Sequence, residues 1–189
     1  MEVFTEETIG ALLTLVESTK GIKQREEFHP EVDLFSHSIQ TMNCAFRESD
    51  DVELIIAAMV HDVGKKICVE DSERYGHETA AHDILFPLVS PKTLWLVENH
   101  MRFWTYILGD MKKLSKVKDL VNHPWFYELT QLARFDKRGR RPLNKINYDR
   151  QKVMDRLNKK TELHFRQLEG LCMEAFGKSG KIHSLEDKE

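Results

Sequence analysis

The stretch VELIIAAMVHDVGKK, residues 52–66, decides how the chain folds. Its apolar residues are too dense for one face of a surface helix, so they predict a short helix that is buried on all sides. His61 and Asp62 directly follow this helix. A carboxylate at that place needs partners, because burying an unpaired charge is costly. A divalent ion, such as Mn, Fe, Co, Ni, Zn or Mg, would satisfy both side chains at once.

Helical periodicity continues on both sides of this segment, while glycine and proline are scarce, at 9 and 5 residues. We therefore predict an all-α fold, a single helical-bundle domain over residues 1–176 with a motif-bearing core at about 30–140. The expected helices lie behind Thr5, from near Asp33, over 52–60 with an end near Gly64, and over 78–85, 93–101, 110–121, 124–135 and 148–176. Residues 65–75 read as a surface connection, and 177–189 as a disordered tail.

Composition excludes several classes of protein. The 189 residues favour one domain, and 41% hydrophobic with 31% charged residues is typical of a globular chain. Mean hydropathy is −0.48, and no apolar run approaches the length of a membrane helix. Three distant cysteines and the lack of a secretory signal favour a reducing, cytoplasmic location. The net charge of −3 gives no general argument for nucleic acid, which stays a possible but not a favoured partner.

Four further residues have the same metal-binding character as the His-Asp pair. They are His37, His77, His100 and Asp136, each near the end of an expected helix or on a turn that faces the core. Together with His61 and Asp62 they could hold two metal ions with Asp62 as the bridge. One ion or two remains open at this point.

The order of these residues resembles a known signature. His37, then His61-Asp62 in AAMVHDVGKK, then Asp136 resembles the H…HD…D pattern of the HD-domain superfamily, which consists of metal-dependent, all-helical phosphohydrolases. The strings LFSHSIQTMNCAF, MVHDVGKK, YGHETAAHDIL and LVENHMRF resemble the HD domain of bacterial tRNA nucleotidyltransferases. In that family this domain carries phosphatase and cyclic-phosphodiesterase activities. The resemblance covers about residues 30–140 and concerns the HD part alone.

The resemblance implies a role for each candidate residue. The primary ligands would be His37, His61, Asp62 and Asp136. His77 and His100 would hold a second ion in two-metal members, or contact phosphate or water in one-metal members. Lys65 matches a lysine that contacts a substrate oxygen in several members. The residues expected to act in catalysis are therefore Asp62, Lys65, His77 and His100.

Local charge supports an anionic substrate. Between Arg134 and Lys145 there are six basic residues, and the only acidic one is Asp136. We read this stretch as a basic loop around a metal ligand, a place where cations can bind phosphate oxygens. Lys137 and Arg138 lie closest to Asp136, so we expect them, with Lys65 and Arg102, to bind substrate. Arg140 and Arg141 read equally well as solvated surface.

The predicted function is a metal-dependent phosphohydrolase that uses a metal-activated water on a nucleotide or related phosphate ester. Two alternatives remain. Some HD-fold proteins with four histidines and two aspartates are mixed-valent di-iron oxygenases, and the basic loop would also suit a non-catalytic module that binds a nucleotide or RNA. Three tryptophans, Trp95, Trp104 and Trp125, are expected in the core. His29 has no metal-like context, and the oligomeric state stays open.

Overall fold

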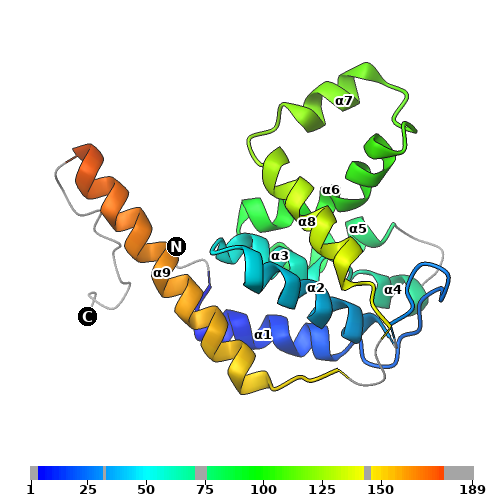
Figure 1. The fold of residues 1–189 in the computed structure, drawn as a ribbon, viewed down its shortest axis with the longest axis horizontal. Helices are drawn as coiled ribbons and strands as arrows, with labels where there is room; N and C mark the ends of the chain where they lie inside the picture. Colours follow the sequence, from blue (N-terminus) through cyan, green and yellow to red (C-terminus); the bar gives the residue numbers. More distant parts are fainter. Residues whose placement is uncertain (1–3, 32, 71–75, 143–145, 177–189) are drawn as a thin grey trace.

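The computed structural model describes residues 4–31, 33–70, 76–142 and 146–176, and every regular element in these ranges is an α-helix (Figure 1). The predicted all-α fold is confirmed. The expected tail, 177–189, lies outside the described residues. The helices are α1 (Glu6–Glu17), α2 (Leu34–Glu48), α3 (Val52–Val60), α4 (Lys65–Glu70), α5 (His77–Leu85), α6 (Pro91–Ile107), α7 (Leu114–Val121), α8 (Phe126–Gly139) and α9 (Arg150–Phe176).

Helix α3 lies at the centre of the bundle. All of its residues except Glu53 are buried, and α2, α6 and α8 pack around it, with α1 and α9 in contact as well. Its N-terminus is held by the Asp51 side chain, which accepts hydrogen bonds from the amides of Glu53 and Leu54. Because neighbours enclose α3, the two residues that follow it enter the interior of the protein.

The first two helices begin where the sequence predicts, and a side chain caps each of them. Thr5 caps α1, and the Asp33 side chain accepts a hydrogen bond from the amide of Ser36 at the start of α2. The second carboxylate oxygen of Asp33 accepts a bond of 2.6 Å from the amide of Gly21. This contact joins the start of the segment between α1 and α2 to its end, and residues between these two points line the pocket described below.

Several expected boundaries were wrong, among them the end of α6, which lies at Ile107 and not at residue 101. Residues 65–70 form helix α4 and not a surface connection, while 71–75 lie outside the described part. Helix α7 begins at Leu114 and not at residue 110, because the chain leaves α6 through Gly109 at φ 76° and runs without helical structure to 113. Helix α8 extends to Gly139, so the first half of the basic stretch is helical and not a loop.

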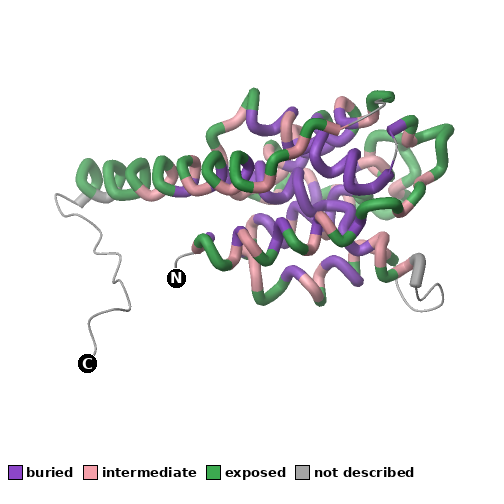
Figure 2. The backbone as a smooth tube through the Cα atoms, turned by 90° about the horizontal axis from the view of Figure 1, so that it is seen from below, coloured by how far each residue is buried: buried purple, intermediate pink, exposed green. Residues whose placement is uncertain are grey.

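Helix α9 projects from the body of the protein (Figure 2). Its first half packs on α1 and α3 and buries Val153 and Leu157, whereas Leu168 and Leu171 further along are exposed. Within the described ranges, no helix combines the length and the apolar character that crossing a bilayer requires.

Candidate metal centre

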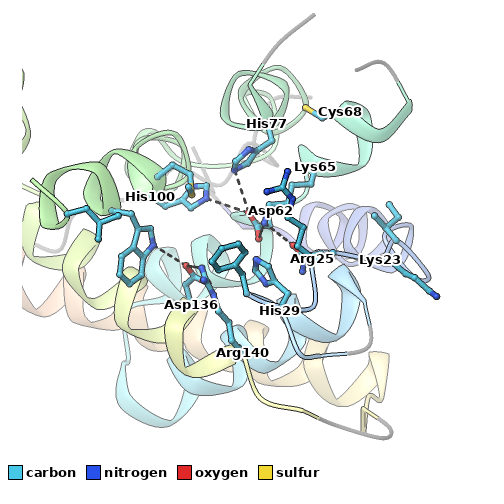
Figure 3. A pocket seen from close by; sticks show the side chains of 16 residues that line it. Lys23, Arg25, His29, Asp62, Lys65, Cys68, His77, His100, Asp136 and Arg140 are labelled. Atoms are coloured by element: carbon cyan, nitrogen blue, oxygen red, sulfur yellow. Dashed lines mark hydrogen bonds and ion pairs between the residues drawn. The ribbon is translucent and has the colours of Figure 1, made fainter. Parts of the chain in front are cut away.

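The six predicted ligands come from five helices and meet at one place in the structure. They are His37 on α2, His61 and Asp62 just after α3, His77 at the start of α5, His100 on α6 and Asp136 on α8. His77 is partly accessible, and the other five are at most 2% exposed. Figure 3 shows His77, His100 and Asp62 pointing toward one another above Asp136.

Four of these side chains form the deeper part of the cluster. The Nε2 atom of His37 lies 3.2 Å from Nε2 of His61, 3.7 Å from Oδ2 of Asp62 and 3.1 Å from Oδ1 of Asp136. The Nε2 atom of His61 lies 3.4 Å from Oδ2 of Asp62. One nitrogen from each imidazole and one oxygen from each carboxylate therefore face a common point, as ligands of a single ion would.

The other carboxylate oxygen of Asp62 belongs to a second, outer group. Its Oδ1 lies 3.7 Å from Nε2 of His77 and 3.5 Å from Nε2 of His100. Asp62 thus offers one oxygen to the deeper group and one to the outer group. This arrangement is the one that a carboxylate bridging two ions requires.

Backbone carbonyls set the orientation of two of the rings. The Nδ1 atom of His61 donates to the carbonyl of Ala58 at 3.1 Å, and Nδ1 of His100 donates to that of Val97 at 2.6 Å. Since a carbonyl can only accept, the proton of each neutral ring is on Nδ1. The lone pair is then on Nε2, which faces the cluster as a metal ligand would.

A buried carboxylate that the sequence analysis did not single out sits behind His37. Oε1 of Glu31 lies 2.7 Å from Nδ1 of His37 and 2.8 Å from Nδ1 of His29. His29 lines the pocket, with its ring edge-on to that of His37 at 5.0 Å between centroids. Glu31 therefore contacts two imidazoles at once. The sequence analysis gave His29 no metal-like context, and this contact shows that His29 shares a carboxylate with a candidate ligand.

Charge at the cluster suits metal binding. Burial raises the pKa of Asp62, but His61 and Lys65 outweigh this effect and keep the pKa well below its usual range. Burial lowers the pKa of His61 and of His77, which favours their neutral, ligand form. Burial also opposes the charge on His37, yet contacts with Asp136 and Glu31 raise its pKa to about 9. A metal ion at His37 must therefore displace a proton.

The cluster also leaves polar atoms without partners. Nε2 of His77, Nε2 of His100 and Oδ1 of Asp62 are buried and have no hydrogen-bond partner among the described residues. Unpaired buried polar atoms are rare and need an explanation. A divalent ion explains all three atoms, so the residues present fit a metal centre of one or two ions.

A pocket of about 850 Å³ opens over the outer group. Four cationic side chains line it: Lys23, Arg25, Lys65 and Arg140. An apolar part is formed by Ile22, Phe28, Met101, Trp104 and Leu108. Pockets of this size take small molecules, and the mixed lining fits an anion attached to an apolar group.

Trp104 and Arg140 have roles beyond those expected of them. Like Trp95 and Trp125, Trp104 is half-buried against the core, but its Nε1 also donates to Oδ2 of Asp136 at 3.2 Å. Arg140 donates to both oxygens of Asp136, at 2.8 to 3.1 Å. Both residues therefore hold Asp136 in place and line the pocket.

The expected substrate contacts divide into two groups. Lys65 lines the pocket, where its Nζ donates to Oδ2 of Asp62 at 2.6 Å. Arg138 instead pairs with Glu48 on the far side of α8, and Lys137 is exposed and does not line the pocket. Arg102 bonds to Asn99 and does not line it either. Lys137, Arg138 and Arg102 therefore lie outside the pocket, contrary to the position expected for substrate contacts, whereas Arg25 and Arg140 line it.

We expect Glu31→Gln to weaken metal binding roughly 10- to 100-fold, the usual cost of removing a carboxylate that orients a metal-bound histidine. Glutamine keeps the shape but removes the charge that holds Nδ1 of His37. Isothermal titration of the metal-free protein with Mn²⁺ or Zn²⁺ measures this effect. Glu26→Gln, in the same segment but exposed, is the control and should bind like the wild type. Equal affinities in the two variants would show that Glu31 does not act on the metal.

Comparisons with known proteins agree with this geometry. The profile of the HD domain matches residues 34–158. A Multifunctional CCA protein of Burkholderia lata is 32% identical over 155 residues, which cover 74% of this chain and 38% of that protein. One of Cupriavidus taiwanensis is 38% identical over 72 residues, which cover 37% of this chain and 17% of that protein. The chain thus spans less than two fifths of the length of these relatives.

The matched segment begins at the first helical turn of α2 and ends within α9, so it includes every candidate ligand. The resemblance noted in the sequence is thereby confirmed, and the chain belongs to the HD domain family.

Proposed function

We propose that this protein is a metal-dependent phosphohydrolase that cleaves a phosphate ester, with a nucleotide as the favoured class of substrate. The observation that carries the proposal is the shared Asp62 carboxylate, which faces two groups of imidazoles at the base of a cationic pocket. The ligands would be His37, His61, Asp62 and Asp136 for one ion, and Asp62, His77 and His100 for a second.

A divalent ion at such a site supplies an activated water and offsets the negative charge of the phosphate. The chain's own side chains provide the remaining functions. Lys65 and Arg25 offer donors for phosphate oxygens at the pocket wall. Arg140 and Trp104 hold Asp136, while the buried walls of the cluster limit the access of other water molecules. A serine or cysteine nucleophile is not required.

The pocket supports a substrate larger than a simple phosphate. Its cationic residues lie beside the cluster, and its apolar part includes Phe28 and Trp104, which can pack against a flat group such as a base. A nucleotide combines a phosphate with such a group. The identity of the base is not part of the proposal.

We expect Arg25→Ala to lower kcat/KM for a phosphate ester by roughly tenfold or more, because a charge-assisted hydrogen bond is worth about 1.5–3 kcal/mol. Arg25 is exposed and forms no ion pair with a described carboxylate, so metal content should not change. Arg138→Ala is the matched control, since Arg138 lies outside the pocket, and its hydrolysis should equal that of the wild type. Steady-state kinetics with metal analysis tests both. If Arg138→Ala lowered hydrolysis and Arg25→Ala did not, the basic stretch between Arg134 and Lys145 would be the substrate site.

The experiment that tests the function is metal analysis followed by a substrate screen. Protein purified without chelator is analysed for Mn, Fe, Co, Ni, Zn and Mg, and is then assayed on nucleotides, cyclic nucleotides and simple phosphate esters with each divalent ion. We expect phosphate release with at least one ion. About two ions per chain would indicate that His77 and His100 are ligands, and one ion would assign them to phosphate or water.

Two other results would contradict the proposal and indicate a different function. An iron-loaded sample that consumes oxygen with an organic substrate and hydrolyses no ester would indicate the di-iron oxygenase. A protein that binds nucleotide tightly and turns over nothing with any ion would indicate a non-catalytic binding module.

A further inference from the structure

A second concave surface lies on the other side of α2, away from the metal pocket. Three adjoining hollows of about 340, 370 and 430 Å³ follow α2 between the end of α8 and the first half of α9. The first two share Asn43 and Asn147, and the last two share Arg156, so together they form one groove. No residue that lines this groove also lines the metal pocket.

Cations are the main charged residues of the groove although the whole chain has a net charge of −3. Four of them form ion pairs, with Glu48, Asp50, Asp149 and Glu162. Two carboxylates line it, Asp149 and Glu162. The cationic residues that line it are Arg47, Arg138, Arg141, Lys152, Arg156, Lys159, Lys160 and Arg166. Cations collected in a concave surface concentrate a positive field, which attracts anionic partners.

Two of these cations, Arg47 and Arg156, are close enough for the charge of one to act on the other. Burial, together with the neighbouring charge of Arg47, lowers the pKa of Arg156. The Arg156 guanidinium lies over the Phe46 ring at 3.9 Å and donates to the side chain of Asn43, while Arg47 donates to the sulfur of Cys44. Among the described residues, neither arginine forms an ion pair. Their like charges repel unless an anion lies between them.

Two further cations in the groove, Arg141 and Lys159, also form no ion pair within the described ranges. Arg138, which the sequence analysis assigned to the substrate, and Arg141 belong to the same basic stretch. Side chains of this stretch point in two directions. Asp136 and Arg140 face the metal pocket, whereas Arg138 and Arg141 face the groove. The basic stretch therefore contributes to two separate surfaces.

We propose that this groove binds the phosphodiester backbone of a single nucleic-acid strand. Arg156 and Arg166 lie ten residues apart on α9, about 15 Å along the helix, so the row of cations can meet more than one phosphate. The middle and the α8 end of the groove carry the amides of Asn43 and Asn147, which can hydrogen-bond to bases or sugars. A nucleic-acid strand offers bases and sugars to these amides, and an acidic peptide does not. A strand is therefore favoured over an acidic protein.

The proposal predicts salt-dependent binding of a labelled 12-nucleotide oligo(dT) by the full chain, measured by fluorescence anisotropy. Each phosphate contact on a single strand contributes about 0.7 to the slope of log K against log salt. The double variant Arg47→Ala/Arg156→Ala should lower this slope by about 1.4 and weaken binding by roughly tenfold or more at 0.1 M salt. The pair Arg141→Ala/Lys159→Ala tests the groove again without removing the contact on Phe46.

The control pair Lys116→Ala/Lys118→Ala removes two exposed cations from α7, outside the groove, and should bind like the wild type. Hydrolysis of a small phosphate ester should not change in any of these variants, which separates the groove from the metal pocket. Three results would overturn the proposal. They are less than a twofold loss in both groove variants, an equal loss in the control pair, or binding of polyglutamate as tight as that of oligo(dT).

Discussion

Asp62→Ala should abolish both metal binding and hydrolysis. Among the described residues, Asp62 is the one whose two oxygens face both groups of imidazoles, at 3.4 and 3.7 Å on one side and 3.5 and 3.7 Å on the other. Alanine removes the carboxylate that the two groups share, so the outer group keeps no anion and the deeper group keeps Asp136 alone. We expect metal content near zero, and hydrolysis at least about a thousandfold lower, which corresponds to about 4 kcal/mol of transition-state stabilisation.

Metal analysis and a phosphate-release assay measure the two losses, and circular dichroism checks that the variant is folded. Asp62→Asn is a second test, because it keeps the shape and removes only the charge. Asp83→Ala, on the exposed face of α5, is the matched control and should behave like the wild type. Full metal occupancy in both Asp62 variants would show that the cluster is a buried polar network and not a metal centre.

The sequence could predict this cluster because its members are marked by their surroundings. His61 and Asp62 directly follow an apolar run that has to be buried, so their own burial and their need for partners follow from the sequence. Asp136 and His100 lie on helices with clear apolar faces. Helical periodicity therefore orients these side chains toward the core, and the order of the residues matches a family signature.

The basic stretch was harder to interpret, because a loop gives no rule for which side chain points where. Once α8 is seen to continue to Gly139, successive side chains turn by about 100° around the helix. Residues four apart then share a face. Arg134 and Arg138 both reach Glu48, while Arg140 and Asp136 pair on the pocket side. An extension of the predicted helix by four residues would have separated the two faces.

Glu31 and His29 could not be found from the sequence for a different reason. They lie in an irregular segment with no periodic pattern, and their positions depend on contacts distant in the chain, such as the bond from the Gly21 amide to Asp33. Helix α4 was missed because its six residues are too few to show periodicity, and its β-branched Ile67 and Val69 favour strand over helix.

Glycine is required at position 64, but not for the reason that the sequence suggested. The sequence analysis took it as the residue that ends the buried helix, but α3 ends at Val60 and Gly64 does not have a positive φ. Its importance comes from the neighbouring helix α5. A Cβ atom at Gly64 would lie 1.9 Å from the carbonyl oxygen of His77 and 2.7 Å from the amide nitrogen of Ala81.

Gly64→Ala should therefore destabilise the protein by about 3 kcal/mol or more, because backbone atoms cannot rotate away as a side chain can. If the protein still folds, α5 must move outward and take His77 with it, so the outer group of ligands should lose its ion while the deeper group keeps one. Urea unfolding followed by circular dichroism measures the first effect, and metal analysis the second.

Gly170→Ala on the exposed part of α9 is the control. Its Cβ meets no atom within 4 Å, so alanine should stabilise the helix by up to about 1 kcal/mol. Equal stability of the two variants would mean that the turn at Gly64 and helix α5 are not packed as closely as the structure shows.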